Sequence, residues 1–460
     1  MSDEVYEAIA RSHSGFVDAP AGCGKTEAIV RTVGRFCDSP QLVLTHTHAG
    51  VDALRQRFRE RKVPQRNYHV DTIAGWCWGW VRRYPRSARY VGSTDFADWN
   101  AVYLAMVNLL QMEFVRRGVL NSYTGTIVDE YQDCTVPMHE LIVALATLLP
   151  CRVLGDELQG VFDFKEPLVA WNDVKSAFQT DLGSLETPHR WIKAGNEPLG
   201  RWLLNSRPTF RQGREPDFRG SPIVRQQIAY RDLNADLIRL THAKQGRICV
   251  IGPKAHGLSK GVQTTLVKQK YRILEPNELS TLRDLVSVLA DGTVTQKARA
   301  ALKFLTTAYG SVPAPDQTFI GKILRCETQR VNRPDRRNLC RTHTEGITPH
   351  LLLDLLAYLE NLNQVNLKLY ESVSALRCIL EEHTKTGAEL SALYADEIAS
   401  RKHQNRSSVF RCSGSTLLVK GLEFDHAVIL RGGDDWGTHR DLYVALTRGA
   451  KSTTLIELTN

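Results

Sequence analysis

The segment APAGCGKT (19–26) constrains the fold of this chain more than any other feature of its sequence. It follows the apolar run GFVDA and begins a helical pattern. A segment of this kind forms a phosphate loop when it joins a strand to a helix in this order. Gly22 and Gly24 allow backbone N–H groups to converge on phosphate oxygens at a helix N-terminus. Lys25 is placed to reach the β- and γ-phosphates, and Thr26 to offer its hydroxyl to Mg²⁺. The segment therefore predicts an α/β fold that binds a nucleoside triphosphate.

A second apolar run ends in four polar side chains, in TIVDEYQD (126–133). Carboxylates left unpaired at the end of a buried strand are costly, so these groups must be neutralised or used. Beside a phosphate loop, Asp129 suits a second ligand of Mg²⁺, and Glu130 suits a group that orients or deprotonates the attacking water. We therefore expect both carboxylates to lie at the nucleotide site.

Short β-branched runs alternate with helical patterns in the first half of the chain and again towards its end. This alternation is typical of parallel sheets that are covered on both faces. It predicts two α/β lobes. The runs are GFVDAPAG (15–22), QLVLTHTH (41–48), TGTIVDE (124–130), CRVLGDE (151–157), RICVIGP (247–253), YRILEP (271–276), HAVILRG (426–432) and STTLIELT (452–459).

Two stretches interrupt the alternation and read as mainly helical insertions, at about 76–122 and about 280–408. We expect a first lobe over residues 1–184 that carries the first insertion, and a second lobe over residues 185–460 that carries the second. The segment 206–222 is rich in Pro, Arg and Gly, which predicts a surface loop in the second lobe.

The charge balance indicates the kind of partner, and the cysteines indicate the cellular compartment. The 59 Lys and Arg against 50 Asp and Glu give a net charge of +9, which favours a polyanionic partner such as nucleic acid. The ten cysteines are scattered without zinc-ligand spacing, which indicates buried thiols in a reducing compartment. The N-terminus is acidic and amphipathic, unlike a signal peptide, and no stretch approaches the about 18 apolar residues of a membrane span. We expect a cytoplasmic protein with no membrane partner.

The pattern Asp-Glu-x-Gln-Asp at 129–133 resembles the second motif of the UvrD/Rep-like superfamily 1A DNA helicases. The resemblance extends over residues 16–451, with eight motifs in the family's order, and it implies a compact member of that family. Its fold would be two RecA-like parallel-sheet lobes, each with a mainly helical insertion. The other segments that carry the resemblance, besides the phosphate loop, are VLTHTHAGVDALRQR (43–57), DTIAGW (71–76), LGDELQGVFDF (154–164), LETPHRW (185–191), STLLVKGLEFDHAVIL (415–430) and LYVALTRGAK (442–451).

The resemblance implies catalytic roles for Lys25, Glu130, Gln159, Arg190 and Arg448. Gln159 would sense the γ-phosphate. Arg190 and Arg448, from the second lobe, would act as arginine fingers, because an always-charged guanidinium suits the charge on the transferring phosphoryl group. A salt bridge between the lobes is the alternative role for both arginines. The ligands implied are ATP, held by Tyr6, Ala21, Gly22, Cys23, Gly24, Lys25, Thr26, His189 and Glu423, and Mg²⁺, held by Thr26 and Asp129.

Five positions depart from the family's pattern. Two of them are Pro188, where the family has an asparagine, and Leu417, where it has a histidine. Tyr6 stands where the family has a glutamine that reads adenine, His189 stands where it has a tyrosine that stacks on adenine, and His46 replaces a phenylalanine. An imidazole stacks with less area than a phenol ring. The sequence therefore leaves open the selectivity for ATP over other nucleoside triphosphates.

The resemblance also implies residues that hold single-stranded DNA. Threonine hydroxyls would bind phosphates, and Phe162 and Phe164 would stack on bases, each stacked base contributing about 1–3 kcal/mol. Core packing is the alternative role for the two phenylalanines. Gln132 and Asp133 would hydrogen-bond neighbouring motifs. The DNA-binding residues implied are Thr45, His46, Thr47, Thr72, Phe162 and Phe164.

Two further clusters have open interpretations. Trp76, Trp78 and Trp80 either form a DNA-facing patch or pack a small helical subdomain, since tryptophans two residues apart spread around a helix. A basic cluster in the second insertion either contacts duplex DNA or is a solvated loop. Its members are Arg330, Arg333, Arg336, Arg337 and Arg341.

Taken together, the sequence predicts an ATP-dependent translocase or helicase that moves 3′ to 5′ along single-stranded DNA and acts at single-strand/duplex junctions. The alternative is a DNA-gated ATPase switch that regulates a partner nuclease in DNA repair or antiphage defence, with little unwinding of its own. A motor that acts on RNA is a third interpretation.

Overall fold

The chain forms two compact units. The structure, a computed structural model, describes residues 2–91, 98–161, 167–242, 244–253, 260–274, 279–327, 333–342, 347–362, 365–402, 410–432 and 436–459. Unit 1 comprises Met1–Val224 and Gly437–Thr453, and unit 2 comprises Arg225–Trp436 and Thr454–Asn460. Segment 437–453 therefore belongs with the N-terminal half of the chain.

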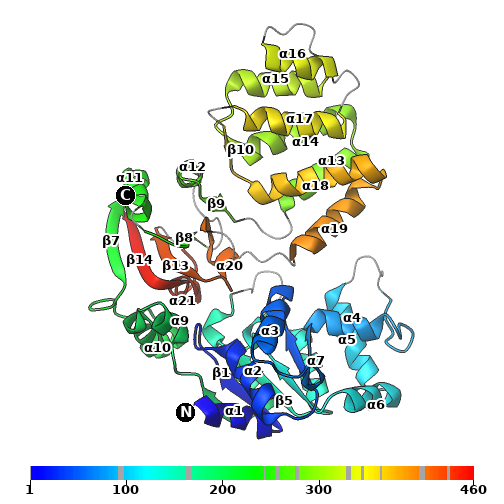
Figure 1. Cartoon of the computed structure of the whole chain (residues 1–460), viewed down its shortest axis with the longest axis vertical. Helices are drawn as coiled ribbons and strands as arrows, with labels where there is room; N and C mark the ends of the chain where they lie inside the picture. Colours follow the sequence, from blue (N-terminus) through cyan, green and yellow to red (C-terminus); the bar gives the residue numbers. More distant parts are fainter. Residues whose placement is uncertain are drawn as a thin grey trace. The chain divides into compact units, whose positions relative to one another are not determined.

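Unit 1 is built on a six-stranded sheet, sheet 1, in which neighbouring strands pair in parallel throughout (Figure 1). The strands carry apolar side chains on both faces, as a parallel sheet covered by helices requires. In spatial order they are β3 (Tyr68–Thr72), β2 (Gln41–Thr45), β4 (Gly125–Val128), β5 (Cys151–Gly155), β1 (Ser14–Asp18) and β6 (Asp181–Ser184).

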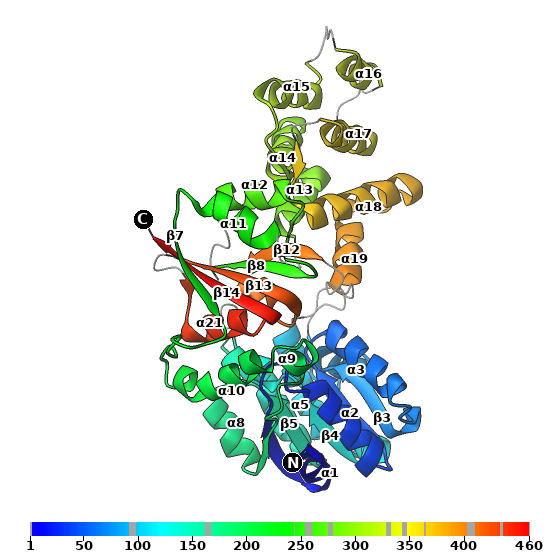
Figure 2. The same ribbon diagram turned by 60° about the vertical axis from the view of Figure 1, so that its left-hand side comes forward.

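Helices cover both faces of sheet 1 (Figure 2). Successive residues of a strand point to opposite faces, so Val17 and Val43 pack against one group of helices while Phe16 and Leu42 pack against the other. The first group is α1 (Ser2–Arg11), α2 (Lys25–Phe36) and α3 (His48–Glu60). The second is α4 (Ile73–Val81), α5 (Trp99–Leu110), α6 (Glu113–Ser122), α7 (Val136–Ala146) and α8 (Trp171–Phe178). Unit 1 also holds α9 (His189–Lys193), α10 (Glu197–Arg211) and α21 (His439–Leu446).

Unit 2 contains a second six-stranded sheet, sheet 2. Strand β8 pairs in parallel with β13 and β12, and β12 pairs in parallel with β9. The core of the sheet joins Ile248, Val250 and Val428 to the apolar faces of two of its three helices, those at Leu233–His242 and Lys260–Lys268. In spatial order the strands are β7 (Val224–Ala229), β14 (Gly449–Thr459), β13 (Phe424–Arg431), β8 (Ile248–Gly252), β12 (Arg411–Ser415) and β9 (Arg272–Ile273), and the helices are α11 (Leu233–His242), α12 (Lys260–Lys268) and α20 (Thr416–Val419).

The rest of unit 2 is a helical module, which we define as α13 to α19 (Figure 1). Its buried leucines, valines and isoleucines form a core of their own. A short antiparallel pair of strands, β10 (Tyr309–Gly310) and β11 (Asn366–Leu367), lies between its helices. The helices are α13 (Ser280–Asp291), α14 (Val294–Ala308), α15 (Ala314–Leu324), α16 (Pro334–Thr342), α17 (Pro349–Glu360), α18 (Tyr370–Thr386) and α19 (Leu390–Lys402).

The predicted class, two parallel-sheet α/β lobes that each include extra helices, is confirmed. The prediction of a surface loop over 206–222 is wrong for its first residues, because α10 continues through Pro208 to Arg211. The buried positions Leu199, Leu203 and Arg207 recur along one face of this helix, and that face outweighs the helix-breaking tendency of proline.

The tryptophans of α4 pack the interior of unit 1. Trp76 is 3% exposed, and Trp78 and Trp80 pack against the same core. Trp78 meets Tyr90 edge-on at 5.7 Å between ring centroids. The packing interpretation of this cluster is therefore confirmed.

Part of the basic cluster in the helical module is used in ion pairs. Arg336 Nη2 donates to Asp316 Oδ1 at 2.7 Å, and Arg333 Nη1 lies 3.7 Å from the same oxygen. Tyr358 also hydrogen-bonds Asp316. Asp316, Arg336 and Tyr358 therefore link α15, α16 and α17. Arg337 is exposed, whereas Arg330 and the side chain of Arg341 lie outside the described residues. For Arg336, a structural role accounts for the charge.

All ten cysteines lie in the described part of the chain, and none of them forms a disulfide bond. The prediction that they are buried is confirmed for six of them and is wrong for Cys326 and Cys378, which are exposed. Among the helices that the structure describes, none combines the length and the apolar character needed to cross a membrane.

Candidate nucleotide-binding site

The phosphate loop, residues 19–24, joins the carboxyl end of β1 to α2. Gly22 has φ 69° and Gly24 has φ 85°, a region that favours glycine. A Cβ at Gly22 would lie 2.7 Å from the ring of Trp191 and 3.0 Å from Cβ of Arg190, and one at Gly24 would lie 3.1 Å from Cδ2 of His189. The loop therefore needs glycine for its conformation and also for its close approach to α9.

Lys25 begins α2 and points to the end of β4. Its Nζ donates to Glu130 Oε2 at 2.6 Å and lies 3.9 Å from Asp129 Oδ1. Burial disfavours the charged ammonium, but the charges of Glu130 and Asp129 outweigh it and raise the pKa of Lys25. Lys25 is therefore held as a cation beside both carboxylates.

The two carboxylates that follow β4 have different environments. The Asp129 side chain is 6% exposed, and burial raises its pKa to about 7 against the opposing charge of Lys25. The Glu130 side chain is 39% exposed, and its backbone has φ 56°, which is uncommon for a residue other than glycine. A buried carboxylate whose pKa lies near 7 can serve as a ligand of a cation. A solvent-accessible carboxylate can exchange protons with water.

Gln132 connects the ends of β4 and β5. Its Nε2 donates to Glu130 Oε2 at 2.5 Å, and its Oε1 accepts from the backbone N–H of Asp156 at 3.0 Å. The amide thus links the motif after β4 to the motif after β5, as the resemblance implies. Asp133 lies in the same turn, η2 (Tyr131–Asp133).

The Asp156 carboxylate is the centre of the site and has no exposed surface. Its Oδ2 accepts from the backbone N–H of Ala21, from Gln159 Nε2 and from the Tyr443 hydroxyl, each at 3.0 Å. Its Oδ1 accepts from Arg207 Nη1 at 2.6 Å. Burial alone would raise the pKa of Asp156, but Arg207 outweighs it and the pKa is lowered, so the group stays ionised. We call these five residues the Asp156 network.

Sequence reasoning missed Arg207, a residue of α10 that is 4% exposed. Besides Asp156, its guanidinium donates to Asp18 Oδ1 at 2.6 Å and to the Tyr443 hydroxyl at 2.8 Å. The more exposed Arg211 donates to the other oxygen of Asp18 at 2.7 Å. Burial would lower the pKa of Arg207, but the neighbouring anions raise it, Asp156 first. Arg207 therefore ties α10 to the ends of β1 and β5.

The structure brings the segments of Arg190 and Arg448 to the phosphate loop within unit 1. Arg448 is 1% exposed, and its Nη2 donates to Gln159 Oε1 at 3.1 Å. The backbone N–H of Arg190 donates to Gly22 O at 3.1 Å, and its Nη1 donates to Thr447 O at 2.7 Å. Gln159 is thus bonded at once to Asp156 and to Arg448.

The remaining residues predicted for the nucleotide lie in varied settings. Tyr6 is 4% exposed and packs in the core between α1 and α2. Burial raises the pKa of the Cys23 thiol to about 12. Thr26 is half-buried in the first turn of α2. Glu423 is exposed and belongs to unit 2, in the turn between α20 and β13.

Three of the predicted DNA-binding residues lie at the carboxyl ends of the neighbouring strands β2 and β3. Thr45 ends β2, Thr47 caps α3 by accepting from Gly50 N at 3.1 Å, and Thr72 caps α4 by accepting from Gly75 N at 2.9 Å. A hydroxyl that accepts in a cap can still donate its proton to a phosphate.

Of the other three predicted DNA-binding residues, His46 lies in the described part of the chain, directly after β2. His46 Nε2 lies 3.4 Å from Cys134 Sγ, so its ring is turned to η2. Phe162 and Phe164 lie outside the described residues.

The donor set fits a phosphate-bound Mg²⁺ and no all-protein metal cage. The described residues contain no group of three or more His, Cys, Asp and Glu side chains that could hold a metal. Mg²⁺ commonly takes one or two carboxylates together with substrate phosphates and water. Asp129 and Thr26 could supply the protein's share of such a set.

No family model matches the chain, and no curated protein matches it. Two similar solved structures are both of Arterivirus nonstructural protein 10, a helicase. One, a complex with DNA, has 14% identity and a TM-score of 0.27 and covers 54% of this chain and 49% of that chain. The other has 12% identity and a TM-score of 0.37 and covers 99% of this chain and 61% of that chain. This chain therefore spans about half to three fifths of the length of those proteins.

Replacing Arg207 with Met should lower the free energy of unfolding by about 3–5 kcal/mol, because it leaves the buried Asp156 without its counter-charge. Arg211→Met is the matched control, since Arg211 pairs with Asp18 from a side chain that is 36% exposed and should cost about 0–1 kcal/mol. Urea titration of both variants measures the difference. Equal, small losses would contradict the central place given to the Asp156 network.

Asp129→Asn should change how stability depends on pH. The folded-state pKa of Asp129, about 7, lies above its ordinary value of 3.8, so the folded protein binds this proton more tightly than the unfolded chain does. Stability should therefore fall as pH rises through that interval. Without Mg²⁺ and nucleotide, the variant should gain stability relative to the natural protein between pH 5 and pH 8. A difference in unfolding free energy that is the same at both pH values would count against this assignment.

Proposed function

We propose that unit 1 binds and hydrolyses a nucleoside triphosphate and that the chain is a nucleic-acid-dependent motor of superfamily 1A type. The observation that carries the proposal is the Lys25 ammonium, which lies 2.6 Å from Glu130 and 3.9 Å from Asp129, beside a loop that needs glycine at positions 22 and 24. A lysine, a buried carboxylate and an accessible carboxylate at one strand end are what phosphoryl transfer to water requires. The triphosphate is ATP and the metal is Mg²⁺, by the resemblance of the motifs.

Lys25 couples nucleotide binding to the state of Glu130. In this structure the Glu130 carboxylate is occupied by Lys25 and by Gln132. When Lys25 turns its ammonium to phosphate oxygens, Glu130 loses that partner and becomes able to orient a water and accept its proton. Mg²⁺ held by Asp129 and Thr26 would offset the negative charge of the phosphates.

Gln159 supports the proposed sensing of the γ-phosphate. Its amide joins Asp156, which holds the phosphate loop at Ala21, to Arg448. Three hydrogen bonds therefore connect the loop to Arg448, at the start of β14. Arg448 and Arg190 would then supply positive charge to the transferring group.

The proposed track for single-stranded DNA is the carboxyl edge of β2 and β3. Thr47 and Thr72 lie there at the N-termini of α3 and α4, where backbone N–H groups and hydroxyls can take up phosphates. The net charge of +9 favours the same partner. Translocation 3′ to 5′ follows from the resemblance to UvrD/Rep-like enzymes.

Lys25→Ala and Glu130→Gln should each reduce DNA-stimulated ATP hydrolysis by at least about 100-fold, since one removes the phosphate partner and the other the proton acceptor. Arg35→Ala, at the far end of the same helix as Lys25, is the control and should keep full activity. Circular dichroism verifies that the variants are folded. Full activity in either site variant would refute the proposed site.

A duplex with a 3′ single-stranded tail should be displaced in the presence of ATP, whereas a duplex with a 5′ tail should not. ATP hydrolysis without strand displacement would favour the DNA-gated switch instead, if a co-purified nuclease then cleaves DNA only in the presence of this protein and ATP. Stronger stimulation of hydrolysis by RNA than by DNA would favour an RNA motor. The assay measures labelled strand release and phosphate release in the same samples.

A further inference from the structure

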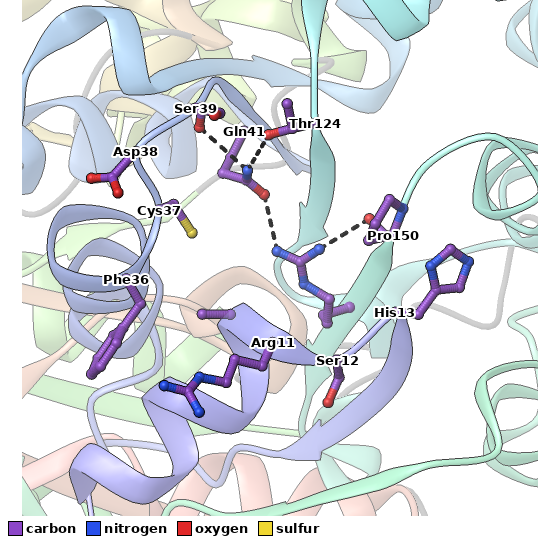
Figure 3. A pocket seen from close by; sticks show the side chains of 12 residues that line it. Arg11, Ser12, His13, Phe36, Cys37, Asp38, Ser39, Gln41, Thr124 and Pro150 are labelled. Atoms are coloured by element: carbon purple, nitrogen blue, oxygen red, sulfur yellow. Dashed lines mark hydrogen bonds between the residues drawn. The ribbon is translucent and has the colours of Figure 1, made fainter.

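A pocket of about 300 Å³ lies in unit 1 at the amino ends of β1, β2, β4 and β5, the edge of sheet 1 opposite the phosphate loop (Figure 3). Its volume is at the lower end of the range for small-molecule sites, about 300–1,000 Å³. The proposed function uses none of its residues. Those that matter here are Arg11, Asp38, Ser39, Gln41, Thr124 and Arg152. Asp38 is the one carboxylate among the lining residues, and it forms no ion pair with Arg152.

Arg152, on β5, brings an uncompensated positive charge to this pocket. It is 2% exposed, its Nη2 donates to Gln41 Oε1 at 2.9 Å, and its Nη1 donates to Pro150 O at 3.1 Å. Its Nε has no hydrogen-bond partner, and no Asp or Glu of the described residues forms an ion pair with it. An arginine cannot shed its charge at neutral pH, so this burial is costly unless an anion offsets it.

Arg207 in the same unit shows the usual arrangement. It is 4% exposed, and its guanidinium meets two carboxylates, those of Asp156 and Asp18. The pKa of Arg207 is raised by those anions, whereas burial lowers the pKa of Arg152. Among the described residues, Arg207 has two carboxylate partners, whereas Arg152 forms no ion pair.

The chain holds the Arg152 guanidinium in a fixed place. The Gln41 amide donates to Thr124 Oγ1 at 2.8 Å and to Ser39 O at 3.3 Å, which turns its oxygen to Arg152. A Cβ at Gly125 would lie 2.7 Å from Arg152 Nη1 and 2.5 Å from Gln41 Oε1. Glycine at this strand start therefore leaves the space that the guanidinium and the amide occupy.

We propose that this pocket binds a small oxyanion, a carboxylate or a phosphate group, that pairs with Arg152. The planar guanidinium presents its free donors in a fork that matches either anion. The hydroxyl of Ser39 and the guanidinium of Arg11, which also pairs with Glu7 Oε1 at 2.5 Å, line the same space and offer further donors. The Thr124 hydroxyl already donates to Pro40 O at 3.2 Å. The site is separate from the phosphate loop, because it lies at the other end of the strands.

Gln41→Glu provides the decisive variant. It places a carboxylate where an amide oxygen now lies 2.9 Å from Arg152, so the chain supplies its own counter-charge and the anion is no longer needed. Arg152→Met removes the charge altogether and serves as the second variant. Neither change touches the phosphate loop, so ATP binding should be the same in all three proteins and reports that each is folded.

Isothermal titration at constant ionic strength, with inorganic phosphate in one arm and succinate in the other, measures the site. The full chain should bind at least one of these anions, and the affinity should fall at least tenfold in Gln41→Glu and in Arg152→Met. Binding of phosphate alone assigns a phosphoryl ligand, and binding of succinate alone assigns a carboxylate. No binding to the natural chain, or equal binding to Gln41→Glu, would overturn the proposal without affecting the proposed motor function, which ATP hydrolysis tests.

Discussion

A carboxylate that is shut off from solvent is stable only where donors and positive charge surround it. Asp156 meets this requirement with groups from the phosphate loop, from the turn that follows β5, from α10 and from α21. The same charge therefore fixes the position of Ala21 at the loop, of Gln159 beside it and of the helix that leads to Arg448. The geometry of the nucleotide site depends on this single buried anion.

Much of the fold could be predicted because most strands are short β-branched or aliphatic runs that end in polar turns. Two of the strands that were not predicted, β12 and β6, lack that signal. β12 reads RCSGS and β6 reads DLGS, with few side chains that favour a strand. β12 forms because β8 and β9 pair with it on both sides. Its conformation is set by tertiary hydrogen bonds that local sequence does not contain.

The candidate site was predictable where its residues follow strand ends and not elsewhere. Lys25, Asp129 and Glu130 belong to local motifs, and parallel strands bring their ends together. Arg207 and Tyr443 lie 51 and 287 residues from Asp156 in the chain. No motif marks Arg207, and the motif LYVALTRGAK that contains Tyr443 does not indicate that its hydroxyl reaches Asp156. A signal did exist for Arg152: a charged residue inside the apolar run CRVLG demands a partner, although the sequence does not say which.

The distribution of thiols has a practical consequence. Cys23 lies in the phosphate loop, but burial raises its pKa to about 12, so it forms almost no thiolate at neutral pH. Cys326 and Cys378 are exposed on the helical module. A maleimide fluorophore would therefore attach to the module and spare the loop, which gives the natural protein two ready attachment points for optical reporters of its movements.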